Sequence, residues 1–169
     1  MKLLAAAAVL FATSTAFAAP PTNDELEACL GKDAGFAPAL SAFKRGMTTD
    51  EANAVWDGAG KVDKYGFSTV KAKGCVGAAQ FKLYFQKDAK TGVVGLYSAA
   101  IDWDKALTTN KDFYQRLVAV LTAKFGEVKD PKAIDKKLVT WVTNDFSIIQ
   151  LTTLGPSRSF DLKMSLPKG

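Results

Sequence analysis

The chain has 169 residues and a net charge of +5, from 22 lysines and arginines against 17 acidic residues. It contains no histidine, which excludes His-based catalytic triads and removes the commonest transition-metal ligand. No glycine-rich phosphate loop is present, and the basic excess is too small to indicate nucleic acid as a partner. The sequence therefore favours a protein that is not an enzyme and needs no cofactor.

Residues 1–18 have the three parts of a cleavable export signal. Lys2 supplies the positive start, residues 3–11 form a short apolar run, and Ala16-Phe17-Ala18 provides the small-x-small pattern that signal peptidase accepts. The apolar run is too short to cross a bilayer, which needs about 20 residues. We therefore expect a periplasmic or secreted mature protein, without stable membrane insertion.

The chain has two cysteines, Cys29 and Cys75. In the oxidising compartment that an export signal implies, such a pair is expected to form a disulfide. A pair of free thiols or a redox couple is the alternative, although a redox couple more often has Cys-x-x-Cys spacing. The bridge would tie the N-terminal segment to the first part of the sheet.

Short helices are expected early in the chain, over residues 24–30 and 50–56, and residues 37–43 could form a short helical turn between them. Asn23 or Asp24 can cap the first of these helices, and Thr48 or Thr49 can cap the second. Short polar side chains suit these positions because they accept hydrogen bonds from the free N–H groups at a helix start.

Alternating apolar and polar side chains predict six strands in two antiparallel meanders. In the second strand, Phe81, Leu83 and Phe85 point to one side, whereas Lys82 and Tyr84 point to the other. The expected strands cover residues 66–73, 80–87, 93–103, 138–143, 146–153 and 159–166.

The strongest helix signal lies between the two meanders, over residues 110–125. Thr109 is the expected cap, with Asp112 as its partner in a near capping box, and Gly126 closes the helix. A polar linker, 127–137, follows. Apolar side chains recur at the helical period on one face, namely Phe113, Leu117, Val120, Leu121 and Phe125.

These elements predict an α+β fold, in which an antiparallel sheet is packed by one long helix and one or two short helices. We expect a single mature domain of residues 19–169. Residues 48–50 and 108–110 both precede a helix that leads into strands. Two tandem helix-plus-meander units, 19–107 and 108–169, would explain this echo, as would two ordinary helix caps.

The stretch Lys44-Arg45-Gly46-Met47-Thr48-Thr49-Asp50-Glu51-Ala52 resembles the start of the helical unit in the outer-membrane assembly lipoprotein (SmpA/OmlA) superfamily. There a Gly-Met-Thr/Ser-x-x-Glu opening leads through helices into an antiparallel sheet. The secreted β-lactamase-inhibitor proteins are similar in architecture, with two helix-and-sheet units in tandem. This chain lacks the lipid-bearing cysteine of the lipoproteins. The resemblance implies a protein-contacting scaffold rather than an enzyme.

A basic sheet surface is the candidate binding site. Lys82 and Tyr84 lie opposite the apolar side of their strand, and Lys71 and Lys73 are expected on a neighbouring strand. Lysines beside an aromatic ring could receive an acidic protein or a glycan phosphate. A merely solvated surface, kept soluble by its lysines, explains the same residues.

Asp102 and Asp104 flank Trp103 at the end of an expected strand. Their spacing would put both carboxylates on one face, where they could bind a cation or act as general acid and base. The alternative is that they end the strand and cap the element that follows.

The function that we expect is an exported, soluble binding module that contacts another envelope or secreted protein, as an inhibitor or an envelope accessory. The alternative is a carrier, with a pocket for a small molecule between the helix at 110–125 and the sheet. A carrier should copurify with its ligand, whereas a binding module should lose its partner when exposed residues are changed.

Overall fold

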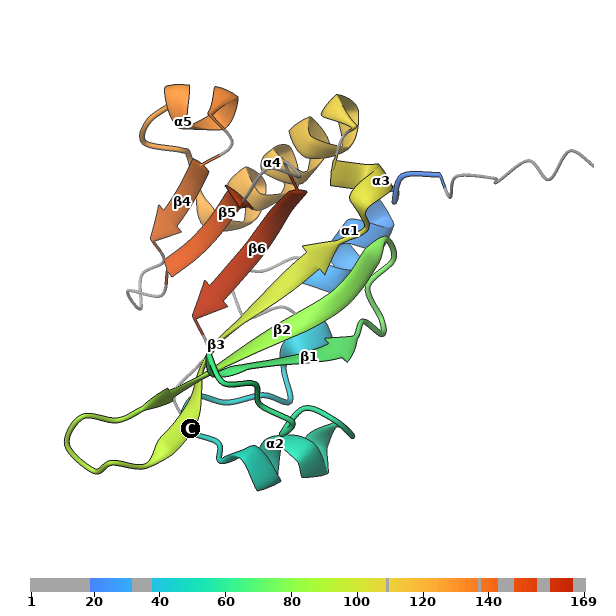
Figure 1. The fold of residues 1–169 in the computed structure, drawn as a ribbon. Coiled ribbons are helices and arrows are strands. Elements are labelled where there is room, and N and C mark those ends of the chain that lie inside the picture. Colours follow the sequence, from blue (N-terminus) through green and yellow to red (C-terminus); the bar gives the residue numbers. More distant parts are fainter. Residues whose placement is uncertain are drawn as a thin grey trace, which may run out of the picture.

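Six strands form one antiparallel sheet in the computed structural model, in the order β1-β2-β3-β6-β5-β4 (Figure 1). The structure describes residues 19–31, 38–108, 110–136, 138–142, 148–154 and 159–165, with side chains as far as residue 152. The export signal expected at residues 1–18 therefore lies outside the described residues. The strands are β1 (Phe67–Lys71), β2 (Ala78–Lys87), β3 (Val94–Trp103), β4 (Leu138–Val142), β5 (Ile148–Leu154) and β6 (Ser159–Ser165).

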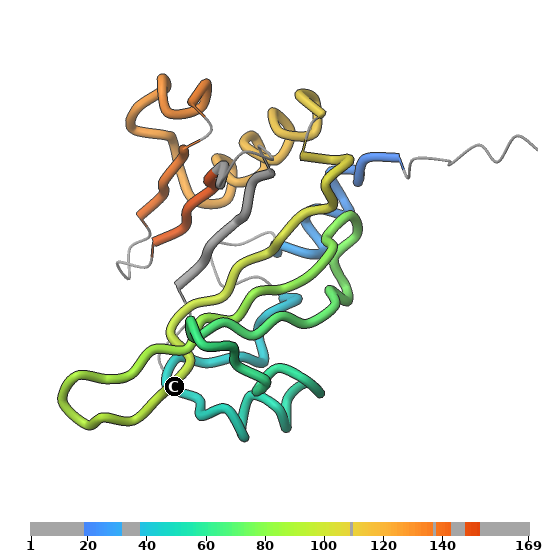
Figure 2. The backbone as a smooth tube through the Cα atoms, in the orientation of Figure 1, coloured from blue at the N-terminus to red at the C-terminus, as the bar shows by residue number. Residues whose placement is uncertain are grey.

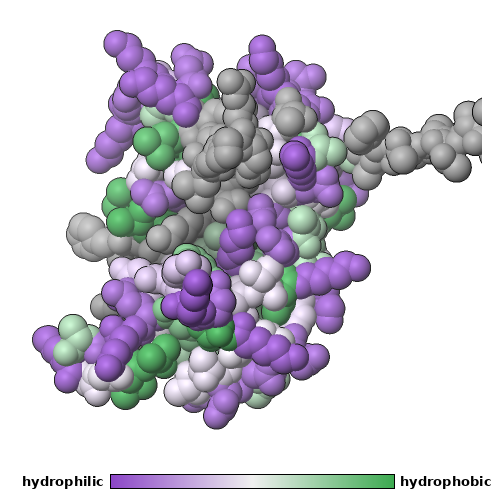
Figure 3. All heavy atoms as spheres, in the orientation of Figure 1, coloured by the Kyte–Doolittle hydropathy of each residue, from purple (hydrophilic) through white to green (hydrophobic). Residues whose placement is uncertain are grey.

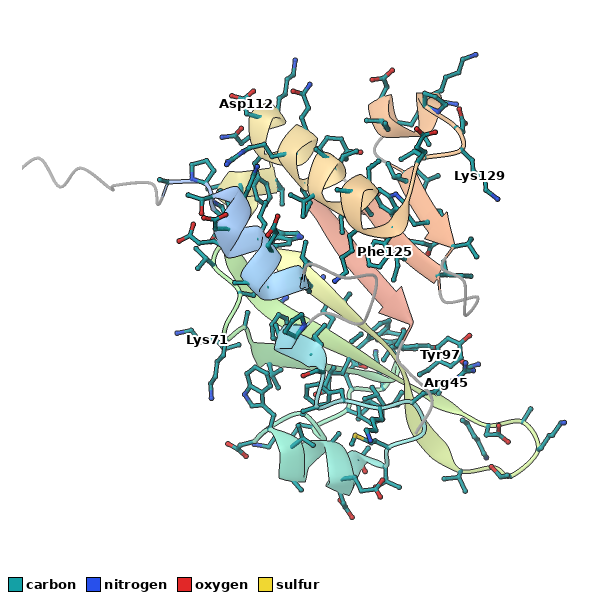
Figure 4. All side chains as sticks on the ribbon, turned by 180° about the vertical axis from the view of Figure 1, so that it is seen from behind. Arg45, Lys71, Tyr97, Asp112, Phe125 and Lys129 are labelled. Carbon is teal, nitrogen blue, oxygen red and sulfur yellow. A yellow bond between two sulfur atoms is a disulfide. The ribbon has the colours of Figure 1, made fainter. Side chains whose placement is uncertain are left out.

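The helices gather on one face of this sheet, which confirms the α+β class (Figures 1 and 4). The two largest, α1 and α4, pack on each other across the middle of that face. No described helix covers the opposite face, which we call the outer face. The helices are α1 (Asn23–Leu30), the 3-10 turn η1 (Pro38–Leu40), α2 (Thr49–Val55), α3 (Lys105–Thr108), α4 (Lys111–Phe125) and α5 (Lys132–Asp135).

The hydrophobic core fills the space between the helices and the sheet. Three of the expected apolar residues of α4, Phe113, Leu117 and Leu121, are completely buried there. The other two, Val120 and Phe125, are only partly buried at its margin. From the sheet, the completely buried side chains of this core include Phe81, Leu83, Ile101, Val139 and Leu151.

Two of the expected helix caps are shifted by one or two residues. Thr22, rather than Asn23 or Asp24, caps α1, because Glu25 lies three residues on and its carboxylate accepts a hydrogen bond from the Thr22 N–H (2.8 Å). Asn110 caps α4 by accepting from two backbone N–H groups, so the expected box of Thr109 and Asp112 is wrong, and Thr109 itself lies outside the described residues. The Thr48 cap of α2 is confirmed.

The two halves of the chain have a similar order of elements. In the first half α1, η1 and α2 precede the meander β1-β2-β3, and after the short α3 the helices α4 and α5 precede the meander β4-β5-β6. The meanders meet through antiparallel pairing of β3 with β6. The expected linker at 127–137 contains α5, so α4 corresponds in position to α1 and α5 corresponds to α2. The similarity between residues 48–50 and 108–110 therefore compares the start of α2 with the start of α4, which do not occupy corresponding positions.

Helix α1 is attached to the rest of the domain at its C-terminal end. Cys29 and Cys75 form the expected disulfide, which joins α1 to the connection between β1 and β2. The ammonium group of the buried Lys124 donates to the carbonyl oxygens of Leu30 and Gly31. A cation suits this position because the last carbonyl groups of a helix carry partial negative charge.

The phenol of Tyr114 joins α4 to α5, and we expect its ionisation to lower the stability of the fold at alkaline pH. Its hydroxyl donates to the Ile134 carbonyl oxygen (3.0 Å). Burial, with the charge of Asp135, raises the pKa of Tyr114 from 10.0 to about 12. A raised folded-state pKa stabilises the fold below pH 10, and that contribution is lost between about pH 10 and pH 12.

We therefore expect the difference in unfolding free energy between the wild type and Tyr114→Phe to shrink as the pH rises from 9 to 12. Below about pH 10, the hydrogen bond that Tyr114→Phe removes contributes a constant amount to this difference. Urea denaturation of both proteins at several pH values measures this difference. A difference that stays the same up to pH 12 would contradict the assignment.

Candidate functional site

The outer face of the first meander presents alternate residues of β1, β2 and β3. Of the residues expected at a binding surface, Lys71, Lys82 and Tyr84 lie on this face, where Lys82 and Tyr84 stand opposite Thr69 and Phe67 of β1. Lys71 lies at the far end of β1 and is well separated from Arg45 and Tyr97 (Figure 4).

Lys73 does not join the other three residues. It follows the end of β1, and its ammonium group lies over the ring of Trp56, 5.2 Å from the centroid. Trp56 in turn packs edge-on against the core residue Phe81 (5.6 Å between centroids). Lys73 is therefore on the helical side of the sheet, because strand alternation no longer applies once β1 has ended.

A neutral polar network occupies the middle of the outer face. The Lys82 ammonium lies 3.0 Å from Oδ2 of Asp102, and the Gln80 side-chain amide donates to the same oxygen (2.7 Å). Lys82 thus lies beside an acidic residue on the next strand. The alternation of side chains along a single strand does not reveal this neighbour. The centre of this face is less basic than expected.

The two carboxylates proposed for a cation have separate roles. Asp102 is engaged by Lys82 and Gln80, whereas Asp104 lies beyond the strand and its Oδ1 accepts from the Ala106 N–H (2.8 Å) at the start of α3. No group of three potential metal-ligating side chains is present among the described residues. Asp104 therefore has the alternative role considered for it, which is to cap the element that follows the strand.

An aromatic cluster lies next to this network. We use this name for Phe67, Tyr84 and Tyr97, and Arg45 lies over the ring of Tyr97. The centroid of Tyr84 is 4.9 Å from that of Phe67 and 6.3 Å from that of Tyr97. The Arg45 guanidinium carbon is 4.6 Å from the Tyr97 centroid. Phe67 and Tyr97 remain 42% and 39% exposed, so the cluster presents apolar rings to solvent.

A β-bulge places Tyr97 in the cluster. Tyr84 pairs with Ser98 and Phe85 pairs with Leu96, so Tyr97 has no counterpart on β2. The extra residue in a bulge redirects its side chain and increases the local twist. Tyr97 can therefore contact Tyr84 although simple alternation would not put it there.

The segment at residues 44–47, just before α2, holds Arg45 in position. The Gly46 N–H donates to the Leu96 carbonyl oxygen (2.8 Å), and the Leu96 N–H donates to Met47 (2.7 Å). Gly46 has a φ of 91°, a value that side chains disfavour. These bonds fasten the segment to β3 just beyond its pairing with β6, with Arg45 against Tyr97 (Figure 4).

A hollow of about 420 Å³ adjoins Arg45 and Tyr97 at the base of the β2–β3 hairpin. This hairpin projects from the domain (Figure 2). Its charged lining residues are Arg45, Lys87 and Asp88. Hydrogen bonds from the Thr91 and Lys90 N–H groups lower the pKa of Asp88, and they commit this carboxylate to the hairpin loop. Among the described residues, no acidic side chain pairs with Arg45.

The space between α4 and the sheet, expected to hold a ligand in a carrier, is filled with protein. Phe113, Leu117 and Leu121 are completely buried in the core at this place. A second hollow, of about 410 Å³, lies between α4 and α1 instead, and its lining residues include Glu27, Val120 and Ala123.

Sequence reasoning missed Phe67, Tyr97 and Arg45 as surface residues. The alternation of β1 does carry a signal, since Phe67 shares the parity of Lys71 and not that of Val70. No comparable signal exists for Tyr97, which depends on the bulge, or for Arg45, which depends on a contact with a distant strand.

None of the described helices is long and apolar enough to cross a membrane. The resemblance of residues 44–52 to a known superfamily stays a prediction. No protein family model matches this chain, and neither a curated protein nor a solved structure is detectably similar to it.

Proposed function

We propose that this protein is an exported binding module, which docks another envelope or secreted protein on the aromatic cluster of its outer face. The observation that carries this proposal is the contact of Tyr84 with the exposed rings of Phe67 and Tyr97, beside an arginine, Arg45, that has no acidic partner among the described residues. Tyrosine, phenylalanine and arginine are enriched at protein interfaces and contribute much of their binding energy.

The cluster suits a protein partner better than a purely ionic one. Covering the rings of Phe67 and Tyr97 removes apolar surface from water, which is the main favourable term in association. The adjacent Arg45 can accept a carboxylate in the same contact, where its planar group offers two parallel N–H donors. We therefore expect the partner to present an acidic side chain flanked by apolar ones.

The disulfide supports the proposed location. A bond such as Cys29–Cys75 persists in the periplasm or outside the cell, and it is rare in the reducing cytosol. The inhibitor or envelope-accessory role implied by the resemblance of residues 44–52 is part of this proposal.

A photo-crosslinking amino acid at position 97 tests the docking site in the envelope and secreted fractions of the host. We expect a protein adduct from position 97 and none from the same probe at Gln115, an exposed residue of α4. The same adducts from both positions, or no adduct from position 97, would contradict the proposal.

Once a partner is identified, Arg45→Glu and Tyr97→Ala should each weaken its binding at least about 10-fold, since interface anchors typically contribute more than about 1.4 kcal/mol. Arg116→Glu makes the same charge change on α4 and should leave the affinity unchanged. Titration calorimetry measures binding, and urea denaturation checks that each variant is folded. Equal affinity of Arg45→Glu and the wild type would exclude this surface.

A further inference from the structure

The two edges of the sheet are built alike but protected differently. Strand order leaves β1 and β4 each with one neighbour, and both strands are five residues long with the same alternation of exposed and buried side chains. The outward N–H and C=O groups of an edge strand can pair with another strand unless something blocks them. Thr69 and Thr140 occupy the central, exposed position of the two strands.

The β1 edge is blocked. Asp63 donates its N–H to the Phe67 carbonyl oxygen (2.8 Å), and its carboxylate accepts from the Phe67 N–H (2.9 Å). The backbone groups of the first residue of β1 are therefore already used. At the other end, the charge of Lys71 opposes the approach of another strand.

Among the residues that the structure describes, nothing protects the β4 edge in this way. Its sequence, Leu-Val-Thr-Trp-Val, contains no charge and no proline, and every residue in it favours or tolerates a strand. Leu138 and Val142 are 56% and 55% exposed, and Ile148 on β5 is 45% exposed. We call these three residues the β4 patch. Hydrophobic side chains gather over this edge (Figure 3), and within the described residues β5 is the only strand that pairs with β4.

We infer that β4 pairs with β4 of a second copy of this protein, antiparallel about a two-fold axis at Thr140. This register puts Thr140 opposite its own equivalent. It also puts Leu138 of one copy opposite Val142 of the other. Apolar side chains thus meet apolar side chains across the pair, an arrangement that stabilises antiparallel strands. The strand is self-complementary, as a two-fold contact requires.

The charge of the protein and the protection of the β1 edge both favour a two-fold dimer of two copies over an open-ended fibre. Each copy carries a net positive charge, so two copies repel least where the contact strands are uncharged. Pairing of β4 with β1 of another copy would extend into a fibre. In that arrangement the incoming β4 would have to displace the hydrogen bonds between Asp63 and Phe67 and approach the charge of Lys71. The β4–β4 contact is therefore favoured, and it yields a dimer with one continuous twelve-stranded sheet from two six-stranded ones.

Sedimentation velocity of the purified protein, over concentrations from micromolar to near millimolar, tests this pairing. We expect the mass to double at high concentration. Thr140→Lys puts two ammonium groups opposite each other and should keep the protein monomeric throughout. Thr69→Lys introduces the same charge on the β1 edge and should dimerise like the wild type. A monomer at every concentration, or a dimer that survives Thr140→Lys, would overturn the inference.

A cysteine at the axis gives an independent measurement. In Thr140→Cys the two new thiols face each other across the pair, close enough for a disulfide. Mild oxidation should therefore yield a covalent dimer in non-reducing gels. Thr69→Cys, the control on the other edge, should stay monomeric under the same oxidation. Equal crosslinking of the two variants would show random collision and would overturn the proposed register.

Discussion

Replacing both Cys29 and Cys75 with alanine should lower the free energy of unfolding by about 4 kcal/mol, the chain-entropy cost of releasing a loop of this size. The two cysteines are 46 residues apart, and the loop between them contains η1, α2 and β1. The crosslink limits the conformations of the unfolded chain, so its removal favours the unfolded state. Both side chains are also buried, and their truncation adds a smaller packing loss.

Urea denaturation of the double variant, compared with the wild type, measures this effect. The urea dependence of the unfolding free energy should also increase, because an uncrosslinked chain exposes more surface when it unfolds. The wild type in strong reductant is the matched control and should approach the double variant. An unchanged urea midpoint in both would show that the bridge contributes little to stability.

Phe113→Ala should cost about 3–5 kcal/mol, the usual range for removing a phenyl ring from a packed core. Phe113 is completely buried at the first turn of α4. Its ring packs edge-on against Trp103, with 5.3 Å between centroids. Trp103 ends β3, the strand that joins the two meanders. Truncation therefore leaves a cavity where the helix meets the middle of the sheet.

Gln115→Ala is the control on the same helix. Gln115 is exposed, and replacement of an exposed residue usually changes stability by less than about 0.5 kcal/mol. Thermal and urea denaturation of both variants should therefore differ strongly. If Phe113→Ala were as mild as Gln115→Ala, α4 would not be packed on the sheet as described.

The two proposed contacts use different parts of the protein and are compatible. The aromatic cluster belongs to the first meander, and the β4 patch belongs to the free edge of the second. Edge-to-edge pairing leaves both outer faces uncovered. A dimer would carry two aromatic clusters at opposite ends of its sheet. Such a dimer could engage a repetitive or dimeric partner with an apparent affinity higher than that of one site.

Local chemistry predicted the strands and the main helices of this fold, but it did not predict α3 or α5, and the turn expected at residues 37–43 is the shorter η1. Alternation within each strand predicted all six strands to within two residues at either end, and the helical period predicted α4. These signals act between near neighbours in the chain, and the resulting apolar faces require an α+β arrangement. Cap positions such as Thr22 were missed because several polar residues in a row can each serve.

The candidate surface was decided by contacts between residues far apart in the sequence. The acid that pairs with Lys82 comes from β3, a bulge turns Tyr97 toward Tyr84, and a separate segment brings Arg45 over Tyr97. By itself, the sequence determined the α+β class, the strand positions and the cysteine pair, because periodicity and composition are local properties. Only the tertiary structure decided which charges are neutralised and which rings gather, because strand register and order set those distances.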